Sequence, residues 1–158
     1  MTPAQLLLIK AEIDADGTLN ALPMTPDGAF AIADALNLDA APAWVVWKSA
    51  VLVDDIMQDM DWTRVDNLSN GKARSWDWMT KAGTINAGRA NIRAGIDSVW
   101  VGTAPDLAVR AAIYVRCKRA ATRAEKILSM GTGTDTVPAT MGFEGAVSYR
   151  DVEQARAA

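Results

Sequence analysis

The chain has 158 residues and a mass of 16.9 kDa; half of its residues are apolar and 22% are charged, which is typical of one folded domain and unlike a disordered chain. It contains no histidine and one cysteine, Cys117, so histidine-based catalysis, nearly all catalytic zinc sites and an intrachain disulfide are excluded. No apolar run approaches the roughly 20 residues that span a bilayer, and residues 1–10 lack the pattern of a signal peptide. We therefore expect a protein of the cytosol that makes no membrane contact.

The net charge of −3 conceals an uneven distribution along the chain. Residues 1–61 carry ten acids and two bases, a net charge of −8, and residues 62–126 carry five acids and twelve bases, a net charge of +7. Residues 127–158 carry four acids and two bases, a net charge of −2. Two interpretations remain open: solvated faces with internal pairing, or contact between oppositely charged regions of neighbouring copies in a ring or stack.

Two helix-start signals occur near the N-terminus. Thr2-Pro3 and Thr25-Pro26 each place a capping hydroxyl before a proline at the first helical position, the arrangement that favours a helix N-terminus. The first predicted helix ends at Gly17, and the second is short. Their apolar residues at helical spacing are Leu6, Ile9 and Ile13 in the first helix and Phe30, Ile32, Ala33 and Leu36 in the second.

The sequence pattern in the middle of the chain predicts three further helices. The segment from Ala43 to Trp47 is either a strand or a buried helical turn, because length alone does not decide between them. A helix follows Ser49, a second runs from a cap at Ser69 to about residue 82, and a third begins at a cap on Asn86. Among the tryptophans, the sequence indicates Trp76 as a core residue. The three with polar neighbours, Trp62, Trp78 and Trp100, are candidate interface anchors.

The longest predicted helix covers about residues 104–129, with Pro105 near its start and Gly131 after its end. One apolar stripe runs along it at helical spacing, formed by Val109, Ile113, Cys117, Ala120, Ala124 and Ile127. A second stripe lies beside the first and is called the basic stripe below; it consists of Arg116, Arg119, Arg123 and Lys126. The basic stripe is expected to face either a neighbouring subunit or DNA.

Residues 131–147 have no helical period, and their glycine, threonine and proline content indicates an extended arm. Ser148 and Asp151 form a capping-box pattern for a short last helix. The predicted fold class is therefore mainly α: a compact helical bundle of residues 1–130, followed by an extended C-terminal arm of residues 131–158 that ends in a short helix. We expect the bundle to stay folded when this arm is removed.

The sequence predicts no catalytic, cofactor or metal site, and so no enzyme. A calcium-loop pattern from Glu12 fails because Pro23 stands where a bidentate glutamate is needed. The cluster of Asp54, Asp55, Asp59 and Asp61 lacks a phosphate cradle. No phosphate-binding glycine loop and no Gly-x-Ser-x-Gly nucleophile motif occur.

A small helical nucleic-acid-binding regulator remains an alternative, because a basic helix face can meet phosphates. A helix-turn-helix motif centred on Gly83 does not fit, since Met79 and Arg89 occupy positions that require a small and an aliphatic residue. The overall acidity also disfavours sequence-specific DNA binding.

Three stretches of the chain resemble small structural proteins of tailed bacteriophages. They are NGKARSWDWM at residues 70–79, CKRAATRAEK at residues 117–126 and PATMGFEG at residues 138–145. The likeness covers most of residues 40–155 and is one of layout and short strings. The family that the chain resembles best is that of the head-to-tail adaptors, the neck or connector proteins of the virion.

The resemblance implies a structural protein that forms an oligomeric ring of twelve copies between the portal protein and the tail. Such a ring lines the channel for passing DNA without sequence specificity, and it assembles in the host cytoplasm. Its other partner is a tail-side neck or tail-terminator protein. The tail segment, here about residues 131–147, is expected to reach the portal or a neighbouring subunit through Val137, Met141 and Phe143. A stopper or tail terminator is the alternative in the same setting, although those proteins are richer in β-structure.

Overall fold

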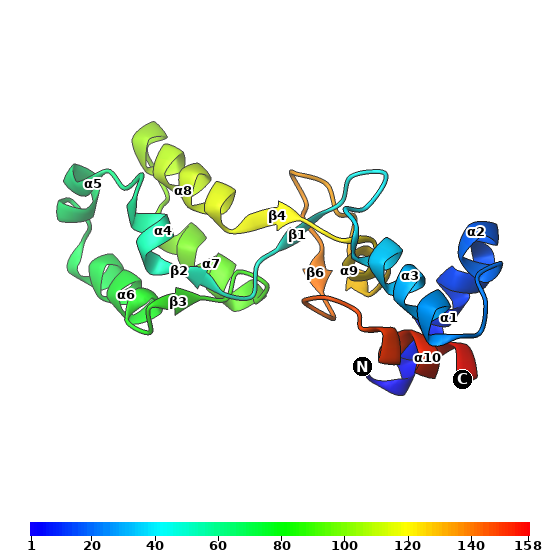
Figure 1. Cartoon of the computed structure of the whole chain (residues 1–158). Coiled ribbons are helices and arrows are strands. Elements are labelled where there is room, and N and C mark those ends of the chain that lie inside the picture. Colours follow the sequence, from blue (N-terminus) through cyan, green and yellow to red (C-terminus); the bar gives the residue numbers. More distant parts are fainter. The chain divides into compact units, whose positions relative to one another are not determined.

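The computed structural model describes residues 1–158 and is mainly α, with ten helices and six short strands; this fold class is the one that the sequence predicts (Figure 1). The chain divides into two compact units: unit 1 consists of Met1–Val46 and Ala120–Ala158, and unit 2 consists of Trp47–Arg119. Unit 2 is thus a continuous stretch inserted between the two halves of unit 1. The predicted division at residue 130 does not match these units, because residues 131–158 belong to unit 1.

Unit 1 contains α1 (Pro3–Ala15), α2 (Gly17–Asn20), α3 (Pro26–Asn37), α9 (Arg123–Ile127) and α10 (Tyr149–Ala157). The predicted caps are present: the side chains of Thr2, Thr25 and Ser148 accept backbone N–H groups at the starts of α1, α3 and α10. α10 packs against α1 and α3, as Figure 1 shows. The core that they share consists of Ile9, Ile13, Leu19, Ala29, Ile32, Ala33, Leu36, Ala124, Leu128, Val147, Val152 and Ala155.

Three pairs of short strands complete the fold. β1 (Val45–Trp47) pairs with β4 (Lys118–Ala120), so the open question about residues 43–47 is decided in favour of a strand. β2 (Val51–Leu52) pairs antiparallel with β3 (Thr84–Ile85), with Val51 opposite Ile85. β5 (Ser129–Met130) pairs antiparallel with β6 (Thr140–Met141), with Ser129 opposite Met141.

Unit 2 contains α4 (Val53–Met57), α5 (Trp62–Asp66), α6 (Asn70–Thr80), α7 (Ala90–Val99) and α8 (Ala104–Arg116). α7 begins after Arg89, three residues later than the predicted cap at Asn86. Trp76 and Trp100 meet edge to face in the core of this unit, with ring centroids 5.4 Å apart. The core consists of Val51, Ile56, Met60, Trp76, Ile85, Ala87, Ile96, Val99, Trp100, Val109, Ile113 and Cys117.

The prediction of one helix over residues 104–129 is wrong. α8 ends at Arg116, residues 118–120 form β4, and a separate helix, α9, starts at Arg123. Thr122 and Glu125 form a capping box, in which each side chain accepts the other's backbone N–H. Next to it the Ala121 N–H donates to the Trp44 carbonyl over 2.8 Å. Backbone pairing with a distant segment and a strong local start signal therefore override a periodicity that continues through the break.

Candidate functional site

The four residues of the basic stripe do not share a surface, because the break after α8 divides them between the units. Arg116 lies on α8 in unit 2 and pairs with Asp59 of the same unit. Arg119 lies in β4, where the residue is partly buried and has an interaction partner. Arg123 and Lys126 lie on α9 in unit 1. The predicted stripe is therefore incorrect as a single site for DNA or for a neighbouring subunit.

Arg123 connects three helices of unit 1 instead of facing outward. Its Nη2 atom lies 2.7 Å from a carboxylate oxygen of Glu12 on α1 and 2.7 Å from one of Asp16, the residue that caps α2. Asp16 also accepts the backbone N–H groups of residues 18 and 19. The hydrogen bond from Arg123 holds the pKa of Asp16 below its usual range. The carboxylates that begin the incomplete calcium-loop pattern thus serve a structural ion pair and a helix cap.

Lys126 and Trp44 form a second contact in unit 1. The Lys126 ammonium lies 5.5 Å from the centre of the Trp44 ring, within the range of a cation–π interaction. The Trp44 indole N–H donates to the Ser129 hydroxyl over 2.9 Å. Gly133 lies directly against the same ring, where a Cβ atom would come within 2.1 Å of ring carbons, so only glycine fits there. Both cations of α9 therefore have partners inside unit 1.

Residues 131–147 contain no helix, as the sequence predicts, but this segment is bound along unit 1 and is not a free arm. The Ala139 N–H donates to the Val45 carbonyl over 2.9 Å, and the Gly142 N–H donates to the Leu128 carbonyl over 3.1 Å. Further along, Val147 N–H donates to the side-chain oxygen of Asn37 over 2.8 Å.

The three predicted arm contacts lie in different surroundings. Val137 is 58% exposed, at a turn in which its N–H donates to the Thr134 hydroxyl. Met141 is partly buried in β6 against the small cluster of Val46, Ala121 and Ala139. Phe143 packs against the main core of unit 1. Only Val137 is presented to solvent as the prediction requires, and the three residues do not form one apolar surface.

Glu125 is a structurally important residue that the sequence analysis missed. It is buried, and its two carboxylate oxygens accept the N–H of Thr122 and the N–H of Gly145. It therefore fixes both the start of α9 and the end of the 131–147 segment. The signal that could have identified it is the Thr122-x-x-Glu125 capping-box pattern.

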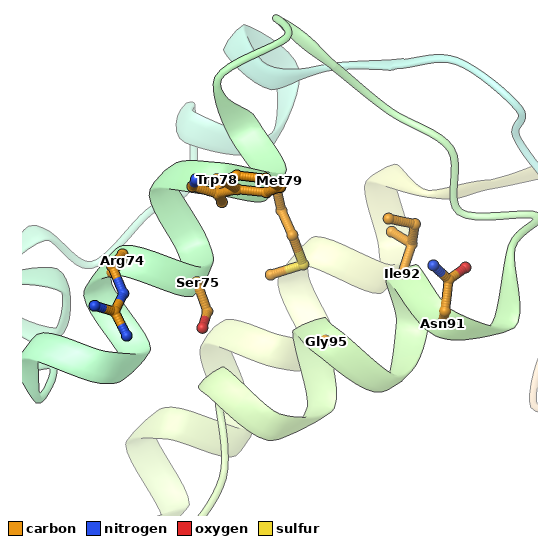
Figure 2. A pocket seen from close by; sticks show the side chains of 7 residues that line it. All are labelled: Arg74, Ser75, Trp78, Met79, Asn91, Ile92 and Gly95. Carbon is orange, nitrogen blue, oxygen red and sulfur yellow. The ribbon is translucent and has the colours of Figure 1, made fainter.

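Unit 2 carries an open apolar groove of about 530 Å³ between α6 and α7. Figure 2 shows its lining: Arg74, Ser75, Trp78 and Met79 from α6, and Asn91, Ile92 and Gly95 from α7. Met79 extends toward Gly95, where a Cβ atom would lie 2.6 Å from the Met79 sulfur. The missing side chain at residue 95 therefore lets Met79 form the floor of the groove.

Trp78 forms one wall of this groove. It is 80% exposed, more than any other large apolar residue of the chain. Trp62 is also exposed, whereas Trp100 is completely buried. The sequence prediction of interface anchors thus fits the exposure of Trp62 and Trp78 and is wrong for Trp100. An indole held in water is unfavourable unless a partner covers it, so the groove is the strongest candidate binding surface of unit 2.

The two compact units carry opposite net charges. Unit 1 has eleven acids and five bases, a net charge of −6, and unit 2 has eight acids and eleven bases, a net charge of +3. The contrast is smaller than that between the sequence blocks, because the acids at residues 54–61 fold into the basic unit. The difference in net charge is nevertheless one between two folded units, and not only between segments of the sequence.

Comparison with protein-family models, curated proteins and solved structures gave no match for this chain. No cluster of three or more acidic, cysteine or histidine side chains is arranged to hold a metal ion. No helix combines the length and the apolar composition that a membrane crossing requires. The features of the chain that indicate a function are therefore the groove, the exposed apolar residues and the charges of the two units.

Proposed function

We propose that this protein is a head-to-tail adaptor of a tailed bacteriophage. In this role identical subunits form a ring, twelve by the resemblance, between the portal and a tail-side neck or tail-terminator protein. The ring lies in the neck of the virion and lines the channel through which DNA passes.

The observation that carries this proposal is the opposite charge of the two compact units, −6 and +3. A subunit with two unlike surfaces binds its neighbours head to tail, and such contacts close into a ring when the rotation between subunits allows it. Opposite charges favour the contact of unit 1 with a neighbour's unit 2 and disfavour contacts between two copies of the same unit. The exposed Val137 remains a candidate contact to the portal or to a neighbouring subunit.

The two alternatives have less support. A stopper or tail terminator would be richer in β-structure, and the strands here are two or three residues long. A nucleic-acid-binding regulator would need the basic stripe, whose members are divided between two units and each have a partner in this chain. We therefore propose the adaptor function over these two alternatives.

The first test is assembly on the portal protein encoded beside this chain, measured by light scattering and negative-stain microscopy. We expect a ring at the narrow end of the portal. Neutralising three exposed acids of unit 1 (Asp14→Asn, Asp34→Asn, Glu153→Gln) lowers the difference in net charge between the units. This variant should form fewer rings and lose them at lower salt, because long-range attraction between charged surfaces is screened.

The matched control neutralises three exposed acids of unit 2 (Asp54→Asn, Asp66→Asn, Asp77→Asn). The net charge of the chain changes by the same amount, but the difference in net charge between the units increases, because unit 2 becomes more positive and unit 1 is unchanged. Rings should form at least as well as with the wild type. The adaptor proposal is abandoned if the wild type does not associate with the portal. Binding to DNA at low salt that is lost in Arg116→Glu and Arg119→Glu would then favour the regulator.

A further inference from the structure

Helix α1 has an apolar outer face that nothing in this chain covers. Its inner face buries Ile9 and Ile13 in the core of unit 1. Leu7 and Leu8, however, are 54% and 49% exposed. The exposed alanines at positions 4, 11 and 15 fall on the same side at helical spacing. α1 therefore has apolar residues on two opposite faces, separated by polar residues such as Lys10 and Glu12. Only the inner face is buried in this chain, so the outer face is available to a partner.

The groove between α6 and α7 is the complementary feature of unit 2. It presents Trp78, Met79 and Ile92 between two helices of eleven and ten residues, long enough to receive most of the thirteen residues of α1. Arg74 lies in the groove one helical turn before Trp78, and it is exposed and has no ion pair within the chain (Figure 2). The groove is thus apolar along its floor and positively charged at one end.

We propose that the outer face of α1 in one copy docks in the α6–α7 groove of a second copy. Helix-in-groove contacts of this kind place an apolar helix face between two helices of the partner. Leu7 and Leu8 contact Trp78 and Met79, and Asp14 faces Arg74. Asp14 is suited to this role because it lies next to the outer face, is exposed and has no partner within its own chain.

Charge identifies a second copy as the occupant of the groove. α1 belongs to the unit with a net charge of −6, and the groove belongs to the unit with a net charge of +3. Each copy offers one of each surface, so the contact repeats from copy to copy and leads to a ring or a filament instead of a symmetric dimer. This inference rests on the proposed function, because it names the contact by which subunits of the ring associate.

Cross-linking between two variants that each carry one introduced cysteine tests the contact directly in the full-length protein. Asp14→Cys and Arg74→Cys each introduce one exposed thiol. The native Cys117 is fully buried, and burial raises its pKa to about 11, so it reacts slowly and serves as the background in the wild type. Loss of the Asp14–Arg74 pair is tolerable because exposed ion pairs contribute little to association.

A short bismaleimide should join the two variants when they are mixed with the portal, and it should join neither variant to itself. The proposal is overturned if the mixture gives no cross-linked dimer. It is equally overturned if either variant alone gives as much dimer as the mixture does.

Substitutions in the apolar contact provide the second measurement. Leu8→Gln and Trp78→Gln change exposed side chains, and each should lower the yield of the cross-link and of portal-bound rings at least tenfold. Their matched controls, Leu38→Gln in unit 1 and Val115→Gln in unit 2, also change exposed apolar residues and should leave both yields unchanged.

The outcomes separate this inference from the adaptor proposal. Rings that form normally with Trp78→Gln would refute the docking contact and leave the adaptor function intact. A specific cross-link in the mixture without any ring on the portal would refute the adaptor function and support the contact. A loss of rings in Val115→Gln as large as in Trp78→Gln would show that the effect is not specific to the groove and would refute the docking contact.

Discussion

Replacement of Thr122 by alanine distinguishes the observed break in the chain from the continuous helix that the sequence pattern predicts. In the structure, Thr122 is the N-cap of α9, and its hydroxyl accepts the N–H of Glu125 over 3.2 Å. Its own N–H donates to a carboxylate oxygen of Glu125 over 3.0 Å. Alanine removes the first of these hydrogen bonds and keeps the second.

The observed break before α9 and a continuous helix predict changes of opposite sign in the free energy of unfolding of Thr122→Ala. Loss of a threonine N-cap lowers the free energy of unfolding by about 0.5–2 kcal/mol, with a typical value near 1 kcal/mol. The buried position of Glu125 favours the upper part of this range, because its N–H loses a partner in surroundings with little water. In the middle of a continuous helix, the same change would stabilise the protein by up to about 0.7 kcal/mol, because alanine has the higher helix propensity.

Urea unfolding monitored by circular dichroism measures this change, and Thr122→Ser is the control. Serine keeps the hydroxyl and caps helices at least as well as threonine, so its free energy of unfolding should stay within about 0.5 kcal/mol of the wild-type value. If Thr122→Ala is as stable as the wild type or more stable, the break before α9 and the role assigned to Glu125 are both refuted.

Three further changes test other parts of the fold. Ile113 is 1% exposed in the core of unit 2, so Ile113→Ala should lower the free energy of unfolding by about 2–5 kcal/mol in urea; exposed Val115→Ala is the control, and an effect below about 0.5 kcal/mol for Ile113→Ala would contradict its burial. Since the hydrogen bond from Arg123 lowers the pKa of Asp16 in the folded state, its contribution is present above the unfolded pKa and is lost as the pH falls through the lower folded value. The stability difference between wild type and Asp16→Asn should therefore shrink below about pH 4, and a difference that is constant with pH would refute the assignment. Residues 47–119 have their own core, so this fragment should give a helical circular dichroism spectrum and a cooperative thermal transition; gradual melting would show that unit 2 needs unit 1.

Helix starts are the part of this fold that the sequence predicts best. Thr2, Thr25 and Ser148 cap helices in the structure as their patterns indicate, and the helix after Pro105 begins at the expected place. A cap acts over three or four residues, so the necessary information is local. The mainly-α class follows from the same signals together with apolar periodicity.

Pairing between distant segments is the part that the sequence does not reveal. The run of apolar residues from Val109 to Ile127 keeps helical spacing, yet its two halves bury their side chains in different cores. The local capping pattern at Thr122 competes with that spacing, and the hydrogen bond from Ala121 to Trp44 decides the outcome. Periodicity correctly indicates the burial of Val109, Ile113, Cys117 and Ala124, but Ala120 in β4 is exposed. It also does not show whether the buried residues belong to one body.

The same reasoning explains the segment after residue 130. Its lack of a helical period correctly excludes a helix, but it does not distinguish a free arm from a chain bound along a core. The distinction lies in distant partners: Asn37 accepts the N–H of Val147, and Val147 and Val152 complete the core around α1 and α3. Removal of residues 131–158 would take Val147, Val152 and Ala155 out of that core, so the structure leads us to expect that unit 1 is destabilised without them.

The candidate binding groove shows a similar division between local and distant information. The exposure of Trp78 fits its polar neighbours, and the sequence predicts both helices, although α7 begins three residues after its predicted cap. The groove itself depends on Gly95 lying opposite Met79, a pairing that neither helix reveals alone.

The distribution of charge in space also depends on the fold and cannot be read from the sequence blocks alone. Because residues 54–61 join the basic unit and residues 127–158 return to the acidic one, the three charge blocks of the sequence become two oppositely charged bodies. A head-to-tail contact between identical copies requires two different surfaces on each subunit, and two bodies of opposite charge supply them.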